Sequence, residues 1–255
     1  MAKLAPRASM RGGNTFSSKV SARESVHNEI LLGLSKREYG VLSPELELVE
    51  LKTHEVLNET GQPIEWCYFV EQGLVSILNV MSDGKSVEIG ISGKEGFVGL
   101  PLVVGLNTSA TRALVQVAAM GYRLRAAAFK RVLEKCPQLE KILNRYSQVL
   151  GLQAAQVAAC NRLHAVEQRL ARWLLMSQDR LGGDEVQLTQ EFLAHMLGTR
   201  RASVTVAAGG LQKSELIQYT RGAVTIVNRA KLEAAACECY GIMTRQSKNW
   251  LRESN

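Results

Sequence analysis

Two patterns of apolar residues divide the chain. Between about residues 42 and 125, apolar residues form short runs separated by Gly, Asn and Asp, a pattern typical of strands joined by turns. From Ala126 onward they recur at intervals of three and four residues, which is typical of amphipathic helices. The patterns together predict an α+β fold with a β-rich N-terminal part and a mainly helical remainder.

The predicted strands are short and closely spaced, and cover residues 64–70, 73–81, 86–91 and 113–123. Ser82-Asp83-Gly84 separates two runs of alternating pattern, which is a good signal for a hairpin. Short strands at this spacing favour an antiparallel barrel or jelly roll over an α/β sheet.

A long helix is predicted after a short one at 126–133, which Pro137 ends. Residues 138–178 contain no proline and a single glycine, Gly151. A helix of about 40 residues would span roughly 60 Å, more than one small domain needs. We expect its apolar stripe to pair with a second copy of the chain, and an ordinary bundle helix is the alternative. The stripe comprises Ile142, Tyr146, Val149, Leu152, Leu163, Val166, Leu170 and Trp173.

The C-terminal region has a compact order of elements. Helical patterns at 188–197 and 200–211 are followed by two predicted strands at 216–219 and 224–227. Helix, tight turn, helix and hairpin is the order of a winged helix-turn-helix. Thr189 and Thr199 suit the N-caps of the two helices, and Gly198 suits a left-handed residue in the turn between them.

Basic and hydroxyl side chains lie near the start of the second helix, the end from which a recognition helix contacts the major groove. Arg pairs with guanine through two hydrogen bonds, while Ser and Thr bond bases or phosphates. By itself the pair Arg200-Arg201 would favour a solvated surface, but this order of elements favours DNA. The predicted DNA-binding residues are Gln190, Arg200, Arg201, Ser203, Thr205, Lys213 and, at the tip of the wing, Arg221.

An excess of basic over acidic residues is found at the two ends of the chain. Residues 1–37 carry seven Lys and Arg against two Glu, 38–166 carry 12 against 13 acidic residues, and 167–255 carry 12 against nine. A basic terminal module suits double-stranded DNA as a partner. The first 25 residues are rich in Ser, Arg and Ala, and we expect a flexible tail there in preference to an organelle transit peptide.

Several classes of protein are not favoured. No apolar run approaches the ~18–20 residues of a membrane-spanning helix, so no membrane partner is expected. The five cysteines have no spacing typical of a disulfide framework, which favours the cytoplasm. The chain contains no Ser/His/Asp order, Walker loop or His-Glu-x-x-His motif, and we expect it not to be an enzyme.

Cys237 and Cys239 are the only cysteines close together in the sequence. One residue separates them, whereas two separate the ligands of a zinc ribbon, and no second pair faces them. Packing of the C-terminal tail is their expected role, with a redox or metal site as the alternative. The sequence therefore predicts no metal site and no cofactor.

From about residue 42 to 240 the chain resembles the Crp/Fnr family of transcription regulators, most strongly at 188–206 and at 164–171. A flexible basic tail and lead-in helix are expected at 1–37, before the part that carries the resemblance. The resemblance implies a cyclic-nucleotide-binding-like jelly roll at 38–136. It further implies a dimerisation helix at 137–178, a winged helix-turn-helix at 179–240 and a C-terminal tail at 241–255. A homodimer on a palindromic operator, in contact with RNA polymerase, is the implied assembly.

The resemblance assigns the guanine contact to Arg201, with two departures from the family pattern. Ala202 stands where Glu usually follows that arginine, and Val206 stands where the family has a second Arg. We therefore expect an operator that differs from the usual one.

The same resemblance implies an effector pocket, which departs from a cyclic-AMP site. The family cassette has Gly-Glu-Leu and then Arg followed by Ser or Thr, and its dimer helix offers Thr and Ser to the base. Here the Glu position is Phe97, the hydroxyl position is Ala113, and the two helix positions are Ala154 and Ala155. A ribose hydroxyl buried without its acceptor costs about 1–3 kcal/mol. We therefore expect an effector other than cyclic AMP, or none, in a pocket formed by Gly96, Phe97, Gly99, Arg112 and Ala113.

Two other possibilities bear on the function. Residues 1–66 contain no cysteine, which excludes the N-terminal iron–sulfur cluster of the family's oxygen sensors. A ligand-binding or interaction protein with the same fold and no site-specific DNA binding is the alternative function.

Overall fold

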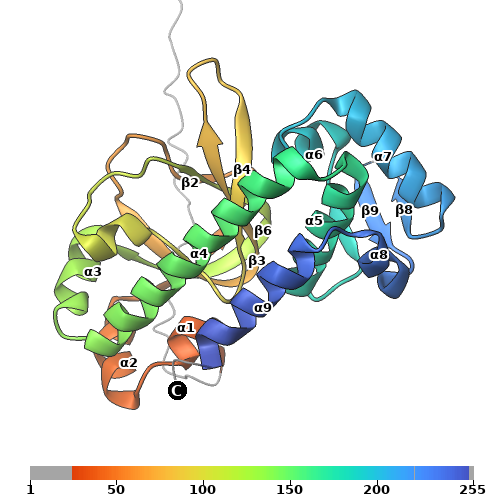
Figure 1. Ribbon diagram of the computed structural model, residues 1–255. Coiled ribbons are helices and arrows are strands. Elements are labelled where there is room, and N and C mark those ends of the chain that lie inside the picture. Colours follow the sequence, from red (N-terminus) through yellow and green to blue (C-terminus); the bar gives the residue numbers. More distant parts are fainter. Residues whose placement is uncertain (1–24, 221, 253–255) are drawn as a thin grey trace, which may run out of the picture.

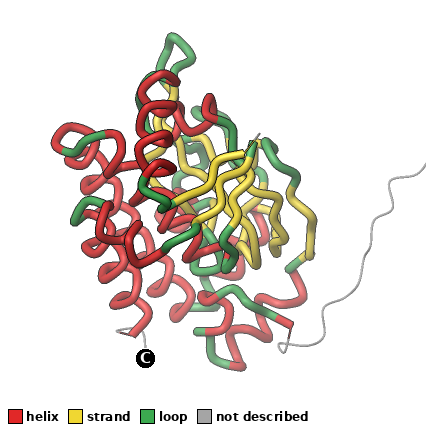
Figure 2. Tube along the Cα trace, turned by 90° about the vertical axis from the view of Figure 1, so that its right-hand side faces the viewer, coloured by secondary structure: helices red, strands yellow, loops and turns green. Residues whose placement is uncertain are grey.

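The computed structural model describes residues 25–220 and 222–252. A β-rich N-terminal domain and a mixed C-terminal domain lie along one long helix, α4 (Pro137–Leu163) (Figure 1). In the view turned by 90°, most helices gather on one side of the strands (Figure 2). The predicted tail at 1–24 lies outside the described residues. The short helix α1 (Glu29–Leu32) lies in the predicted lead-in region. A second one, α2 (Lys36–Leu42), crosses its predicted end at residue 37 and precedes a 3-10 turn, η2 (Ser43–Glu45).

The N-terminal domain is built on one connected antiparallel sheet, in agreement with the predicted class of fold. The long strands β3 and β6 pair along most of their length, β1 and β4 flank them, β2 adds to β6, and β5 adds to β3. The strands are β1 (Glu47–Leu51), β2 (Val56–Asn58), β3 (Trp66–Val80), β4 (Ser86–Ser92), β5 (Phe97–Val98) and β6 (Arg112–Arg125).

The two strands predicted at 64–70 and 73–81 form the single strand β3. Gly73 lies inside it with a φ of +90°, and the pairing with β6 shifts register on both sides of this residue. A Cβ at position 73 would lie 2.6 Å from the backbone of Ala119. Gly73 is therefore a bulge within a continuous strand rather than a turn, because glycine permits either arrangement.

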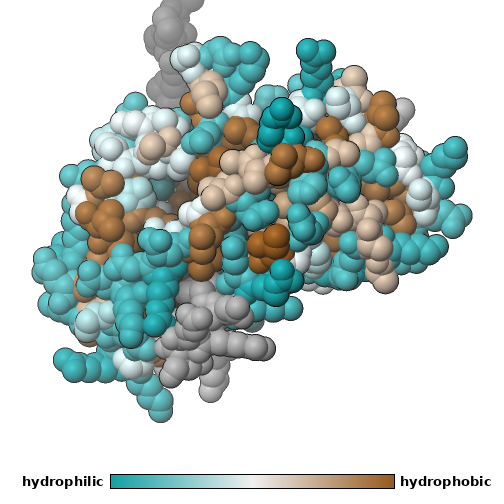
Figure 3. Space-filling model, in the orientation of Figure 1, coloured by the Kyte–Doolittle hydropathy of each residue, from teal (hydrophilic) through white to brown (hydrophobic). Residues whose placement is uncertain are grey.

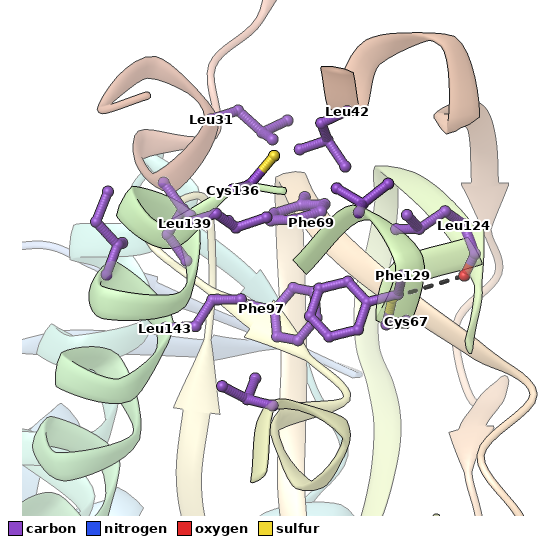
Figure 4. Packing of buried hydrophobic residues seen from close by; sticks show 14 of the residues in the cluster. Leu31, Leu42, Cys67, Phe69, Phe97, Leu124, Phe129, Cys136, Leu139 and Leu143 are labelled. Atoms are coloured by element: carbon purple, nitrogen blue, oxygen red, sulfur yellow. Dashed lines mark hydrogen bonds between the residues drawn. The ribbon is translucent and has the colours of Figure 1, made fainter. Parts of the chain in front are cut away.

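A core of aromatic and aliphatic side chains joins the sheet to the helices (Figure 4). The ring of Phe97 lies 4.8 Å from that of Phe69 and 5.2 Å from that of Phe129, measured between centroids. Leu139 and Leu143 point into the same core from α4. Phe129 belongs to α3 (Ala126–Leu133), which has the predicted bounds, and a 3-10 turn, η3 (Leu100–Val104), adds Leu102 and Val103.

The prediction of one continuous helix of about 40 residues is wrong. The chain forms α4 and then α5 (Val166–Leu181), separated by His164 and Ala165, whose ψ angles of 148° and 151° are extended. Tyr146 packs in the core of the N-terminal domain, whereas Leu170 is fully buried in the C-terminal domain. The break lets the two segments bury their apolar faces in different domains, which one straight helix could not do.

The C-terminal domain contains the predicted winged helix-turn-helix. Its helices pack on α5, and its wing is a three-stranded antiparallel sheet in the order β7-β9-β8. The predicted boundary at 178/179 falls within α5, which belongs to the core of this domain. The elements are β7 (Glu185–Gln187), α6 (Gln190–Met196), α7 (Arg201–Lys213), β8 (Ile217–Thr220), β9 (Ala223–Ile226) and α8 (Arg229–Ala235).

The segment predicted as a C-terminal tail includes most of a helix, α9 (Cys239–Arg252), which packs beside α4. Met243 is 1 % exposed and lies among Leu74, Ile91, Val157 and Met176, so α9 is held by the sheet, α4 and α5 together. Burial of this apolar face explains why the segment is ordered as a helix. Within 25–220 and 222–252, none of the helices combines the length and hydrophobicity that a membrane span requires.

Candidate nucleic-acid interface

The helix-turn-helix has the local geometry that its sequence predicts, with one exception. The hydroxyl of Thr189 caps α6 by accepting from the backbone N–H of Phe192 at 3.2 Å. Gly198 has a φ of +55° in the turn between the helices. The N-cap of α7 is Arg200 and not Thr199, and Arg200 makes no capping bond with its side chain. The helix begins one residue later than expected because Arg200 itself has an extended backbone.

A buried arginine supports the turn between α6 and α7. Arg169, on α5, donates through Nη2 to the backbone carbonyl of Leu197, the C-cap residue of α6. Ala194 and Val204, one on each helix, are buried where the helices cross. The position of α7 is thus fixed by α5 as well as by α6.

Most of the predicted DNA-binding residues lie together at the start of α7. Arg200 and Arg201 are exposed, and Ser203 is half-buried beside them. Thr205 donates its hydroxyl to Oε1 of Gln190 at 2.7 Å, which joins α7 to the start of α6. These side chains form one polar, cationic surface at the N-terminal end of a helix, where anions are also favoured by the helix dipole.

One predicted residue, Lys213, lies apart from this group. Lys213 is the last residue of α7, so a rise of 1.5 Å per residue places it about 18 Å along the helix from Arg201. Arg221, at the tip of the wing, lies outside the described residues.

Val206 is a further candidate contact, and the sequence interpretation noted it only as a departure from the family pattern. Its side chain is 77 % exposed on the outer face of α7, next to exposed Ala202 and Thr205. An exposed apolar side chain on such a helix suits contact with the methyl group of thymine. The spacing of buried Val204, Ala207, Ala208 and Leu211 is the sequence signal that places Val206 on the outer face.

The hairpin formed by β3 and β4 faces this surface. A groove of about 940 Å³ separates Met81 and Lys85 of the hairpin from Arg200 and Arg201. The hairpin therefore lies beside the N-terminal end of α7.

A second cavity, of about 560 Å³, lies between the sheet and α6. Arg112 and Gln116 of β6 line it from one side, and Phe192 and Met196 of α6 line it from the other. The guanidinium of Arg112 is paired with Glu59, with Nη2 at 2.9 Å from Oε2. This hydrogen-bonded pair lowers the pKa of the Glu59 carboxyl.

The five residues predicted to form an effector pocket are not brought together, and only Arg112 lines the cavity. Phe97 is buried in the aromatic core seen in Figure 4, and Ala113 is buried in another cluster on the sheet. Gly96 and Gly99 flank short β5, beside Phe97. The prediction of a pocket around Phe97 is not supported, because its ring fills space in the domain core.

A buried carboxyl group links the two domains. Glu88 of β4 accepts from Nε1 of Trp173, on α5, at 2.7 Å and from Oγ of Ser76 at 2.6 Å. Ser76 also contacts the side-chain amide of Gln116, which lines the cavity. Burial raises the pKa of Glu88 to about 7. Nothing in the sequence signals this role, since an acidic residue in an alternating strand is ordinarily exposed.

The expectation that no second pair faces Cys237 and Cys239 is wrong. Cys160 and His164 lie beside them, and the four potential ligand atoms all lie within 4.8 Å of one another. These residues could hold a metal ion. They are far apart in the sequence, so spacing could not show that they meet.

Two family models match the chain over the domains described above. The cyclic nucleotide-binding domain matches residues 48–136, and the Crp-like helix-turn-helix domain matches residues 168–235. No curated protein sequence matches the chain.

Solved structures share this fold at low sequence identity. FixK2 from Bradyrhizobium japonicum is similar with a TM-score of 0.65 and 16% identity, over 75% of this chain and 98% of its own. The c-di-GMP responsive global regulator CLP from Xanthomonas campestris gives 0.63 and 16%, over 75% and 99%. A Crp/Fnr-family transcriptional regulator from Thermus thermophilus gives 0.57 and 22%, over 74% and 98%.

Two of these structures, CLP and the Thermus thermophilus protein, are named as regulators. The two matched domains lie on the two sides of one long helix, in the order that the resemblance to the Crp/Fnr family implies. The chain belongs to the Crp/Fnr family of transcription regulators.

Proposed function

We propose that the protein binds a palindromic DNA operator as a homodimer and that its N-terminal domain controls this binding. The observation that carries the proposal is the exposed polar and cationic start of α7, where Arg200, Arg201 and Thr205 lie on one surface. A winged helix-turn-helix presents this end of its second helix to the major groove. The proposed partner is the DNA of a bacterium, so the proposed location is the cytoplasm.

Each side chain of this surface has a role in the proposal. Arg201 pairs with a guanine, Ser203 and Thr205 bond bases or phosphates, and Val206 contacts a thymine methyl. Lys213 and Arg221 reach phosphates farther along the duplex and contribute affinity without sequence preference.

The proposed dimer is supported by an exposed apolar face on the second half of α4. Leu152 is 53 % exposed and Leu163 is 74 % exposed. Between Leu152 and Leu163, exposed small residues would let two helices approach closely. Apolar residues are seen on the surface along the second half of α4 in Figure 3. These face residues are Gly151, Leu152, Ala155, Ala158, Ala159 and Leu163.

Pairing of two α4 helices along this face would relate the two C-terminal domains by a twofold axis. The two recognition helices would then enter successive major grooves about 34 Å apart. A dimer bound in this way is also the form expected to contact RNA polymerase.

Control by the N-terminal domain is supported by the position of the second cavity. A ligand in it would contact β6 and α6 at once and so bias the relative position of the two domains. The cavity combines Leu78, Leu114 and Phe192 with polar side chains, and the guanidinium of Arg112 is already paired with Glu59. Because this arginine is not free to pair with a cyclic phosphate, we propose an effector other than cyclic AMP.

The function is tested by selecting bound sequences from random duplex DNA with the purified full chain, with and without cyclic AMP. Recovery of a palindrome with half-sites one helical turn apart would support a site-specific dimer. Dependence of that recovery on cyclic AMP would contradict the proposed effector class. DNA affinity that shows neither sequence preference nor salt dependence would instead favour a ligand-binding or interaction protein.

Replacing Arg201 by Ala should weaken binding to the selected operator by about 1–3 kcal/mol and relax the base preference at one position in each half-site. The expected cause is loss of the two-bond contact with guanine. Fluorescence anisotropy on the operator and on single-base variants measures both effects. Lys213→Ala is the matched control, since loss of a phosphate contact should weaken all sequences equally. Unchanged affinity and preference in Arg201→Ala would show that the helix docks differently.

A further inference from the structure

Three thiols and an imidazole converge where the two domains join. Cys160 lies in the last turn of α4, and His164 is the first residue of the break before α5. Cys237 precedes α9, and Cys239 is its first residue. Sγ of Cys160 lies 3.5 Å from Sγ of Cys237, and Sγ of Cys239 lies 3.5 Å from Nδ1 of His164.

The size of this cluster matches one metal ion with four protein ligands. A zinc–sulfur distance of about 2.3 Å gives edges of roughly 3.8 Å between sulfur atoms in a tetrahedron. The four ligand atoms all lie within 4.8 Å of one another, and two of their separations are 3.5 Å. An iron–sulfur cluster would place bridging sulfides among the ligands and hold them farther apart.

The backbone presents the ligands in two pairs. Cys160 and His164 are four residues apart at the end of a helix, a spacing that places two side chains on the same face. Cys237 and Cys239 lie on the turn that starts α9, where the N–H of Tyr240 donates to the carbonyl of Cys237 at 3.1 Å. The three thiols are buried and His164 is half-buried.

Two buried arginines supply an independent observation. Arg169 and Arg172 are 5 % and 4 % exposed, and the Nε atom of each has no hydrogen-bond partner among the described residues. Within the same described ranges, neither forms an ion pair with a carboxylate at 4.0 Å or less. Buried cations of this kind require a nearby negative charge.

Glu88 of β4 faces Arg172, and the thiol cluster can provide further negative charge beside Arg169 and Arg172. Three thiolates around a divalent cation carry one net negative charge. The positions of the two arginines therefore complement a metal-loaded site.

We propose that this chain binds one Zn²⁺ ion in a tetrahedral site formed by Cys160, His164, Cys237 and Cys239. With four protein ligands the site is closed and structural rather than catalytic. The ion ties the end of α4, the break before α5 and the start of α9 to one point. The ion thereby fixes the position of the C-terminal domain relative to α4. This inference is independent of whether the protein binds DNA.

The first experiment measures metal in the full chain, purified under reducing conditions with zinc and then dialysed. We expect elemental analysis to find one zinc per chain. In Cys239→Ser and in His164→Ala, the metal content should be at most about one tenth of that value. Cys136→Ser is the matched control, because Cys136 is a buried cysteine outside the cluster and this variant should retain the ion.

A second measurement does not depend on the folding of variants. Titration of the wild-type chain with Co²⁺ should give thiolate-to-cobalt charge-transfer bands and the intense visible bands of a tetrahedral ion, which Zn²⁺ should abolish. Absence of stoichiometric metal in the wild-type chain would overturn the proposal, as would an octahedral cobalt spectrum. Full metal content in Cys239→Ser would overturn it as well. A Cys160–Cys237 disulfide in freshly purified protein would identify a redox pair instead.

Discussion

Replacing both Leu152 and Ala155 by Glu should convert the proposed dimer into folded monomers. Both residues are exposed on α4, so the substitutions leave the core of the protomer intact. In a dimer paired along this face, each carboxylate would be buried without a partner, at a cost of about 3–5 kcal/mol. The two recognition helices would then no longer be held at a fixed spacing, and affinity for a palindromic site should fall by several orders of magnitude.

Light scattering coupled to size-exclusion chromatography measures the mass in solution, and circular dichroism confirms that the monomer is folded. Asn144→Glu provides a matched control, because Asn144 is exposed earlier on α4, outside the apolar face. The control should remain dimeric. A dimeric Leu152→Glu/Ala155→Glu protein would show that the chain associates through another surface. Leu170 is unsuitable for this test, since it is fully buried within the C-terminal domain.

Glu88→Gln should change how the free energy of unfolding depends on pH. Burial raises the pKa of Glu88 to about 7 in the folded chain, from about 4.5. Below pH 4.5 the carboxyl is protonated in both the folded and the unfolded chain. Between about pH 4.5 and 7 only the folded chain keeps the proton, so the free energy of unfolding falls as pH rises. The total fall from this group is about 3 kcal/mol, and it is complete above pH 7.

The glutamine variant lacks this ionisation and can still bond Ser76 or Trp173. We therefore expect it to be more stable than wild type at pH 8 and similar or slightly less stable at pH 5. Arg172 and Arg180 are the charged groups that favour the ionised form, and both belong to α5. Urea unfolding at pH 5, 6, 7 and 8 measures the difference, with exposed Glu50→Gln as the control. A difference between wild type and Glu88→Gln that is constant with pH would contradict the raised pKa.

Elements whose signals lie within a few residues could be predicted from the sequence. The hairpin turn at Ser82-Asp83-Gly84, the cap at Thr189 and the left-handed Gly198 depend on backbone preferences that each segment carries alone. Helical and alternating periods likewise indicated most strands and helices, and with them the β-rich domain and the winged helix-turn-helix. The polar surface at the start of α7 followed from the same local pattern.

The remaining features come from tertiary packing, because they depend on which surfaces meet. The local signal for the break at His164 is confined to Gln168, whose side chain accepts from the N–H of Ala165 at 3.2 Å. The break exists because Tyr146 and Leu170 are buried in different domains. By sequence, Phe97 stands at a position of the family's nucleotide-binding cassette. In the folded chain its ring packs in the aromatic core. The cysteine and histidine cluster joins residues 77 positions apart, a contact that only the packing of α9 on α4 creates. Residue spacing carries no information about such contacts, since the free energy of burial selects them only once the whole chain has folded.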